Sequence, residues 1–359
     1  APARQDTLLL VRHSQDPGGA TGVTLLAASP GDARSLVLFV PIGTLVEVPG
    51  FGLDRLGLAY QYGGPALVEA SLENALGIAI DHTAAVSDSG LAALLGRVGG
   101  LELAVPERLV LRAGDGAAMV RFEPGGQFLD GPRLAEYWGF VQRGEDELAS
   151  FSRQQLVWER LLAAAAADPT VVERLLAGGA PQLETDAETV WLQSLLAGLA
   201  QAQASDRLSF TLLPVQPFGA AGSVATADAA SFRLDEQAAA ELVGSLLLAS
   251  VPDGDASAAV RVQVLNGVGV PGIGQLVDER LEGGGFRIVL TDNASRFDFA
   301  QTRIVVYDES PASIDAAQRV HERLGVGTIL VSRQPQTVVD LTIVVGADFA
   351  AQPNREQPS

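Results

Sequence analysis

Short strand-forming runs alternate with helical runs over residues 6–105, and this alternation constrains the fold more than any other feature of the sequence. Residues 7–11 and 35–40 consist mainly of Leu, Val and Phe, whereas residues 65–76 and 90–96 have helical patterning. Strands that are interleaved with helices form a sheet that the helices cover. The pattern therefore predicts an α/β layer architecture for the N-terminal part of the chain.

A segment rich in structure breakers divides the chain. Residues 251–259 are small and polar and include Pro and Gly, so we interpret them as a linker between a first domain at residues 5–250 and a second domain at residues 260–350. Strand-forming and helical runs alternate again after the linker, which predicts that the second domain is a smaller α/β domain. The Gln- and Pro-rich residues 351–359 are expected to form a disordered tail.

The composition excludes several kinds of site. The chain has 359 residues, 47% of them hydrophobic, which is enough to fill two or three cores. It has no cysteine, so it can form neither disulfides nor thiolate metal sites. With three histidines and no HExxH motif, a multi-histidine metal site is not expected. The sequence also has no Ser-His-Asp arrangement of a hydrolase. We expect no resident cofactor.

The charge balance argues against nucleic acid as a partner. The formal net charge is −19 at pH 7, and the chain has no Arg-rich run that could neutralise phosphates. An acidic surface also repels anionic lipid headgroups, although a local basic pocket can persist within it. The sequence contains no run of about 18 consecutive apolar residues, which excludes a transmembrane helix inside this chain.

The stretch Tyr60–His82, YQYGGPALVEASLENALGIAIDH, joins a glycine turn, an amphipathic helix and the beginning of a strand. It resembles the signature of the LytR-CpsA-Psr family. The resemblance extends over nearly the whole chain, because Val264–Gly267, Thr302–Val305 and Val345–Phe349 resemble the small C-terminal domain that is often attached to the family. For the first domain, the resemblance implies a mixed β-sheet covered by helices in an α/β/α arrangement.

The resemblance also implies a function. Members of the family are envelope proteins that move anionic glycopolymers from a polyprenyl-pyrophosphate carrier onto the cell wall, in a pocket lined with arginines and aspartates. The implied partners are a polyprenyl-linked glycan or another long apolar ligand, with envelope proteins or peptidoglycan as further partners. The implied location is the extracytoplasmic face of a bacterial membrane, held by an N-terminal anchor that is absent from this chain. Such a transfer needs positive charge on the leaving phosphate and a metal ion, Mg²⁺, held by carboxylates.

Most charged residues of the family's motifs are replaced in this chain. The family's Pro-Arg-Asp-Thr motif corresponds to residues 41–44, which are Pro-Ile-Gly-Thr. Because isoleucine cannot bind phosphate and glycine has no side chain to bind Mg²⁺, the usual chemistry is unsupported at this position. Residues 11–13 place His13 near an aspartate of the family, and residues 19–22 carry neither charge of an Arg-Ser-Asp-Thr motif.

A few polar residues remain as candidates for the site. Gln142 stands where the family has the arginine of a Tyr-Val-Arg element, and Arg153 begins a retained Arg-Gln-Gln motif. The catalytic candidates are Arg153, Arg143 and Arg12; the ligand-binding candidates are Arg153, Gln154, Gln142 and Arg55; and the metal candidates are Asp146 and Glu147. Each arginine also has a structural interpretation as a surface residue. His82, which ends the signature, is expected to be a structural histidine.

The sequence therefore leads to three hypotheses about function. The first is a non-catalytic relative that binds polyprenyl phosphate or a similar apolar ligand, because charged positions are lost beside intact structural ones. The second is an active Mg²⁺-dependent phosphotransferase with a rearranged site, which attaches anionic glycopolymer to peptidoglycan. The third is an envelope scaffold that acts through its C-terminal domain.

Overall fold

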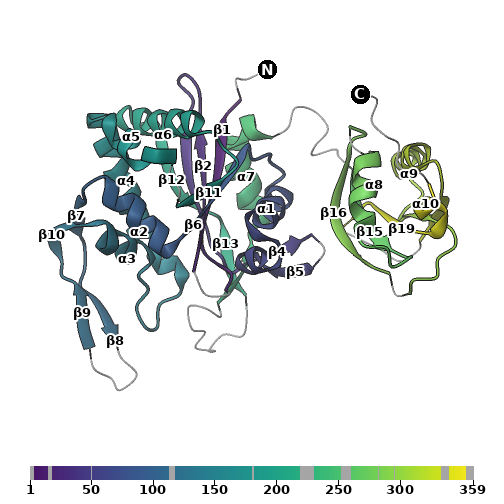
Figure 1. The fold of residues 1–359 in the computed structure, drawn as a ribbon, viewed down its shortest axis with the longest axis horizontal. Coiled ribbons are helices and arrows are strands. Elements are labelled where there is room, and N and C mark those ends of the chain that lie inside the picture. Colours follow the sequence, from purple (N-terminus) through teal and green to yellow (C-terminus); the bar gives the residue numbers. More distant parts are fainter. Residues whose placement is uncertain are drawn as a thin grey trace. The chain divides into compact units, whose positions relative to one another are not determined.

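A computed structural model describes most of the chain (Figure 1). The described residues are 4–14, 18–49, 51–112, 118–179, 182–218, 230–251, 260–281, 283–294, 296–332 and 339–352. The chain divides into two compact units, one of residues 1–46 and 54–251 and one of residues 252–359 with 47–53. The predicted linker after Val251 and the predicted tail after Gln352 lie outside the described residues.

The first unit is built on a six-stranded mixed sheet with the order β11-β6-β1-β2-β3-β12. Its strands are β1 (Asp6–His13), β2 (Ala20–Ala28), β3 (Ser35–Val40), β6 (His82–Ser87), β11 (Leu183–Thr185) and β12 (Leu208–Leu212). The pairs β1–β2, β2–β3 and β6–β11 are antiparallel, whereas β1–β6 and β3–β12 are parallel. The predicted mixed sheet is therefore confirmed.

Helices cover both faces of this sheet. Leu25 and Leu26 point to opposite faces of β2, and both are buried. Leu26 belongs to the core beneath α4 and α6, whereas α1 contacts β2 and β6 without contributing to that core. The helices of the first unit are α1 (Leu56–Leu76), α2 (Asp88–Arg97), α3 (Gly131–Gly139), α4 (Phe151–Ala167), α5 (Thr170–Leu175), α6 (Thr189–Ala204) and α7 (Glu236–Leu246), with short 3₁₀ turns η1 (Glu147–Ser150), η2 (Ala177–Gly179) and η4 (Leu248–Ser250).

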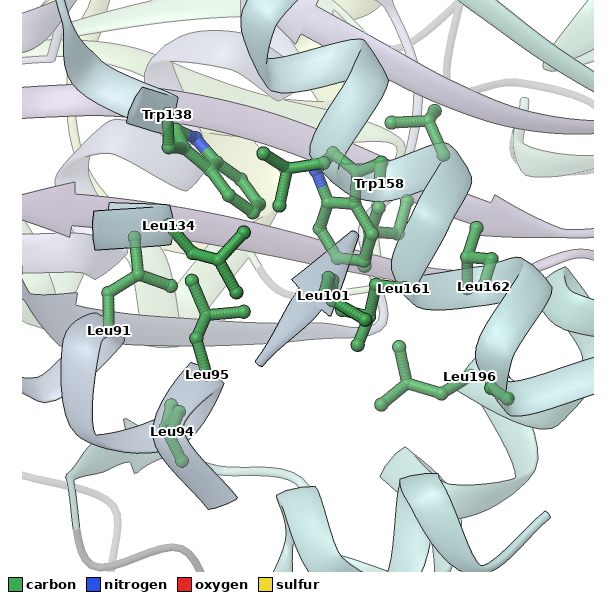
Figure 2. Close-up of a cluster of buried hydrophobic side chains, with 14 of the residues drawn as sticks. Leu91, Leu94, Leu95, Leu101, Leu134, Trp138, Trp158, Leu161, Leu162 and Leu196 are labelled. Atoms are coloured by element: carbon green, nitrogen blue, oxygen red, sulfur yellow. The ribbon is translucent and has the colours of Figure 1, made fainter. Parts of the chain in front are cut away.

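The core on the α4 and α6 side is aromatic at its centre and aliphatic around it. The rings of Trp138 and Trp158 meet edge to face with centroids 5.4 Å apart. Leucines of α2, α3, α4, α6 and β7 surround them (Figure 2). Burying a leucine side chain contributes about 2 kcal/mol relative to leaving it exposed. This core fixes α4, and with it the segment that leads into α4.

Other strands between residues 44 and 234 form smaller sheets. A two-stranded sheet pairs β7 (Leu101–Val105) with β10 (Gly125–Leu129), and a second pairs β8 (Leu109–Arg112) with β9 (Ala118–Phe122). A four-stranded sheet has the order β13-β14-β4-β5, with the strands β13 (Val215–Phe218), β14 (Ser231–Leu234), β4 (Thr44–Val48) and β5 (Gly52–Arg55). The sequence pattern predicts β7 but none of the other strands.

The glycine turn in the signature is a break inside a longer helical segment. Gly64 has φ 67° and ψ −161°, a conformation that only glycine adopts readily. The helix resumes at Pro65, as predicted, because proline suits a first helical turn. The helical turns before the break, residues 56–62, have no clear amphipathic period and are missed by the sequence pattern.

The second unit is a five-stranded sheet with the order β16-β15-β19-β17-β18. Its elements are β15 (Val260–Asn266), α8 (Ile273–Leu281), β16 (Phe286–Asn293), β17 (Arg303–Val306), α9 (Pro311–Leu324), β18 (Thr328–Val331), β19 (Leu341–Val345) and α10 (Ala347–Ala350). Buried Val, Ile and Leu side chains of the strands form its core with α8 and α9. These elements agree with the predicted second α/β domain. No helix of the part of the chain that the structure describes is long and apolar enough to cross a membrane.

Candidate functional site

A cavity of about 710 Å³ lies at the end of the main sheet where β1, β3 and β12 end and β2 begins. Crevices at strand ends are the usual ligand positions in α/β folds. The described residues that line it are Arg12, Ser14, Gly18, Gly19, Ala20, Thr21, Gly22, Val23, Phe39, Val40, Pro41, Ile42, Gly43, Arg55, Gly57, Leu58, Asp88, Gly139, Val141, Glu147, Leu148, Ser150, Phe151, Gln154, Leu212 and Ala230.

Much of the cavity wall is apolar. Val23 and Phe39 come from the sheet, Leu58 comes from α1, and Leu212 ends β12. The ring of Phe39 packs edge to face against Phe151 at a centroid distance of 4.9 Å. Such a wall removes apolar groups of a ligand from water, which is favourable in proportion to the area covered. The cavity can therefore cover apolar groups of a ligand.

Arg12 places a guanidinium group in the cavity wall. Its Nε donates to Thr21 Oγ1 at 3.0 Å and lies 3.0 Å from Asp88 Oδ1, and its Nη2 donates to the Thr21 carbonyl at 3.0 Å. The side chain is 13% exposed, and this burial lowers the pKa of the guanidinium although Asp88 raises it. A methyl group on Gly139 would lie 2.7 Å from Arg12 Nη2, so the glycine gives Arg12 its space.

Glu147 extends from η1 to the loop that follows β3. Its Oε2 accepts a hydrogen bond from the backbone N–H of Ile42 and its Oε1 accepts one from Gly43, both at 2.7 Å. Burial raises the pKa of Glu147 to about 7, and Asp146 adds to this, whereas the two N–H donors and Arg55 lower it. A carboxyl group with such a pKa in a cavity is a candidate functional group.

Gly43 makes the approach of Glu147 sterically feasible. A Cβ atom at this position would lie 2.4 Å from the carbonyl oxygen of Ala230 and 2.8 Å from Glu147 Oε1. The loop therefore has no space for the aspartate that the resemblance implies at this position. A carboxylate from another element takes up that space instead.

Arg153, the leading catalytic candidate, does not line the cavity. Its side chain is buried, and Nη1 donates to the carbonyls of Phe140 and Ala149, both at 2.9 Å. Its Nη2 lies 3.1 Å from Glu145 Oε2. The guanidinium thus ties together the segment between α3 and α4, and this segment carries Glu147.

Gln142 belongs to the same structural network. Glu145 accepts hydrogen bonds from the backbone N–H of Gln142 at 2.8 Å and from its Nε2 at 3.0 Å. Burial alone would raise the pKa of Glu145, but the hydrogen bonds from Gln142 and the charge of Arg153 outweigh it and hold the pKa below its ordinary value. The Gln142 Oε1 accepts from the N–H of Val110 at 2.9 Å, so this side chain also faces away from the cavity lining.

The remaining candidates are divided between the cavity and the surface. Arg55 and Gln154 line the cavity, and Gln154 Nε2 donates to Ser150 Oγ at 2.9 Å. Arg143 is exposed and lies outside the lining. Asp146 also lies outside it and accepts from the N–H of Leu148 at 3.0 Å, which caps the 3₁₀ turn that carries Glu147.

No group of three or more His, Asp or Glu side chains that could hold a metal ion occurs among the described residues. Each oxygen of Glu147, a metal candidate, already accepts a backbone hydrogen bond. His82 lies on β6, outside the cavity lining, with Nδ1 3.2 Å from Asp186 Oδ2 and its ring against Trp191. This packing agrees with a structural histidine.

Two residues of the site are not among the sequence candidates. These are Thr21 and Asp88, the partners of Arg12, which come from β2 and α2. Glu147 is a candidate from the sequence, but its contact with a loop about a hundred residues earlier in the chain has no local signal. The Pro-Ile-Gly-Thr motif does mark the loop that contributes to the cavity, and no local pattern could have shown which side chain meets it.

The LytR-CpsA-Psr family profile matches residues 25–246, and the chain belongs to this family. Residues 259–349 match the domain described as LytR cell envelope-related transcriptional attenuator. The resemblance that the Tyr60–His82 signature carries is therefore confirmed.

Individual relatives cover parts of the chain. The "Probable cell wall biosynthesis protein LcpB" of Corynebacterium glutamicum is 29% identical over 154 residues, which are 43% of this chain and 36% of that protein. The Enterococcus faecalis polyisoprenyl-teichoic acid–peptidoglycan teichoic acid transferase TagU is 34% identical over 102 residues, which are 27% of this chain and 34% of that protein. The chain thus spans about a third of the length of these two relatives.

Solved structures confirm the fold of the first unit. Bacillus subtilis TagV has a TM-score of 0.55 and 17% identity, with 69% of this chain and 98% of that chain covered. TagT bound to LI-WTA has a TM-score of 0.53 and 17% identity, with 69% of this chain and 91% of that chain covered. These likenesses concern the fold alone.

Proposed function

We propose that this protein binds a polyprenyl phosphate, or a glycan linked to one, in the strand-end cavity and takes part in cell-wall glycopolymer assembly without catalysing transfer. The name of one relative supports this ligand class, since TagU is a polyisoprenyl-teichoic acid–peptidoglycan teichoic acid transferase. LcpB, a probable cell wall biosynthesis protein, supports the role in the cell wall. We further propose that the protein works at the extracytoplasmic face of the membrane, held by an anchor that precedes this chain. Peptidoglycan and other envelope proteins are its proposed partners.

The observation that carries the proposal is the pairing of an apolar cavity with an uncharged motif loop. The cavity keeps Val23, Phe39, Leu58 and Leu212 in its wall, which suits a prenyl chain. Residues 41–44, where the family has its arginine and aspartate, supply backbone N–H groups in place of charged side chains. The cavity can thus bind a ligand, while its motif loop lacks the charged side chains that would accelerate phosphoryl transfer.

The remaining charges fit a binding role better than a catalytic one. Arg12 is held by Thr21 and Asp88, and the neighbouring Asp88 carboxylate offsets its positive charge. Stabilising a leaving pyrophosphate requires donors and metal aimed at the charge that develops on it. The proposed candidates for Mg²⁺, Asp146 and Glu147, both already accept backbone hydrogen bonds. We therefore expect no metal requirement for binding.

The test begins with the lipid content of the purified protein. The chain is produced in cells that contain polyprenyl phosphates, extracted with organic solvent, and the extract is analysed by mass spectrometry. We expect a copurifying polyprenyl species in the unaltered protein and less of it in Leu58→Trp, which narrows the cavity. The matched control is Val190→Trp on α6, where the side chain is 72% exposed and the lipid content should not change.

Catalysis is tested separately with a polyprenyl-pyrophosphate glycan donor. We expect no transfer above buffer, with or without Mg²⁺. An empty lipid extract would favour the scaffold hypothesis and direct attention to the second unit. Clear Mg²⁺-dependent turnover would overturn the non-catalytic proposal.

One observation favours an active enzyme as the second candidate. Arg12, Arg55 and Glu147 line the same cavity, so two cationic groups and a carboxylate are within one site. In that case Arg12→Gln should abolish transfer because it removes a cation that touches the ligand. Arg153→Ala should also lower it, since Arg153 holds the segment that carries Glu147.

A further inference from the structure

The contact between Glu147 and the loop after β3 has the geometry of an occupied anion site. Two consecutive backbone N–H groups, those of Ile42 and Gly43, point at the two oxygens of one carboxylate, and both hydrogen bonds are 2.7 Å long. Successive N–H groups that converge on one point form a concave site for anions. Hydrogen bonds from N–H groups to a charged oxygen are also stronger than those to a neutral one.

This anion site opens into the proposed ligand cavity. Ile42, Gly43 and Glu147 all belong to the cavity lining, together with Arg12 and Arg55. A ligand whose hydrocarbon chain lies against the apolar wall can therefore bring its polar end to the two N–H groups. Arg55 adds positive charge near this position, since its field lowers the pKa of Glu147.

The carboxylate of Glu147 is poorly suited to remain charged at this position. Burial opposes its ionised form, and the adjacent Asp146 opposes it as well. The carboxylate stays because the two N–H groups and Arg55 favour it. A ligand oxyanion would receive the same hydrogen bonds and the same field, so the two anions compete for one set of donors.

We propose that the backbone N–H groups of Ile42 and Gly43 bind the phosphate of the apolar ligand, and that Glu147 is an internal competitor that occupies this site until the phosphate displaces it. This inference rests on the proposed function, because it assumes that the cavity takes a phosphate-bearing prenyl chain. It adds the position of the phosphate and a residue that sets its affinity.

The competition makes binding depend on pH. Protonation removes the charge of Glu147 and leaves it one acceptor oxygen, so one N–H donor becomes free for the phosphate. The pKa of Glu147 is about 7, so affinity for the phosphate is highest below this pH and falls as the pH rises through it. The other charged groups facing the site are Asp146, Arg55, Arg12 and Asp88.

The experiment compares two probes that share a prenyl chain and differ in a methyl phosphate group. Methyl farnesyl phosphate is a diester with one fixed negative charge, and farnesol has the same prenyl chain without it. Binding of each to the unaltered chain and to Glu147→Gln is measured by calorimetry at about pH 8. The matched control is Glu173→Gln on α5, an exposed carboxylate outside the cavity, which changes the net charge equally.

We expect Glu147→Gln to strengthen binding of the phosphate probe by about ten- to a hundredfold and to leave farnesol unchanged, because it removes an anion that competes for charge-assisted hydrogen bonds. Glu173→Gln should alter neither. In the unaltered protein the affinity ratio of phosphate probe to farnesol should fall between about pH 6 and pH 8, and this fall should be absent in Glu147→Gln.

The outcomes separate the inference from the proposed function. If both probes bind, the ratio is independent of pH and Glu147→Gln behaves like Glu173→Gln, the internal competitor is refuted while the proposed function stands. If neither probe binds, both are refuted. Should Glu147→Gln fail to fold, the pH dependence of the ratio in the unaltered protein still decides the inference.

Discussion

Replacing Glu147 by Gln should change how the stability of the first unit depends on pH. In the folded protein this carboxyl group has a pKa of about 7, whereas the ordinary value is 4.5. The folded state therefore keeps a proton that the unfolded state loses at lower pH. Its contribution to the free energy of unfolding is fully present below the ordinary pKa and is lost as the pH rises through the folded-state value.

The magnitude follows from the size of the shift. One pKa unit corresponds to about 1.4 kcal/mol, so the whole shift is worth about 3 kcal/mol. Between about pH 5.5 and about pH 8.5, a range that avoids acid unfolding, the loss amounts to about 2 kcal/mol. Glutamine does not titrate, so the free energy of unfolding of the unaltered protein should fall by this amount relative to Glu147→Gln over that range.

Urea unfolding followed by tryptophan fluorescence measures the effect. All three tryptophans, Trp138, Trp158 and Trp191, belong to the first unit, so the signal reports on that unit. Comparing the two proteins at each pH cancels the titration of all other groups. Parallel stability curves, with differences constant within about 0.5 kcal/mol, would refute the buried, protonated Glu147 on which the argument rests.

Three further substitutions test the architecture of the site. Arg153→Ala should lower the free energy of unfolding by about 2–3 kcal/mol, because it leaves two carbonyls and the partly exposed carboxylate of Glu145 without their donor. Arg153→Lys should restore part of this loss. A loss below about 1 kcal/mol in urea unfolding would contradict the role of Arg153 in holding its segment. Gly64→Ala should lower the free energy of unfolding by about 1–3 kcal/mol in the same assay, because Gly64 has φ 67° and ψ −161°. Gly96→Ala, inside α2 with open space at Cβ, should leave this free energy unchanged or raise it. Equal effects of the two substitutions would argue against the break in α1. Gly43→Ala should abolish binding of methyl farnesyl phosphate in calorimetry, because the new Cβ would lie 2.4 Å from a backbone oxygen. The control variant Gly126→Ala, with nothing near its Cβ, should bind this probe normally. Retained binding in Gly43→Ala would exclude this loop from the site.

The fold could be predicted from the sequence largely because most of its strands and helices have a recognisable local sequence pattern. Residues 36–40 are apolar throughout, and the strand that contains them is buried on both faces. The second unit is equally regular. The sequence pattern does not predict the strands between residues 109 and 129. These strands are short and carry exposed apolar residues such as Met119 and Phe128, so apolar and polar residues do not alternate along them.

The site was predictable only where a family motif marks it. Residues 41–43 and Arg12 do line the cavity, as do Arg55, Gln154 and Glu147. Arg153 lies in a retained motif, yet it is buried and binds carbonyls of its own segment. Whether an arginine points into a cavity or into the protein depends on tertiary contacts, and these leave no periodic trace in the sequence.

The steric situation at Gly43 has a consequence for engineering. A Gly43→Asp substitution would place its Cβ 2.4 Å from the Ala230 oxygen and 2.8 Å from Glu147 Oε1. An aspartate at this position is therefore not acceptable by itself, because atoms of two other segments fill its space. Installing a carboxylate on this loop requires coordinated changes around Ala230 and Glu147 as well as at residue 43.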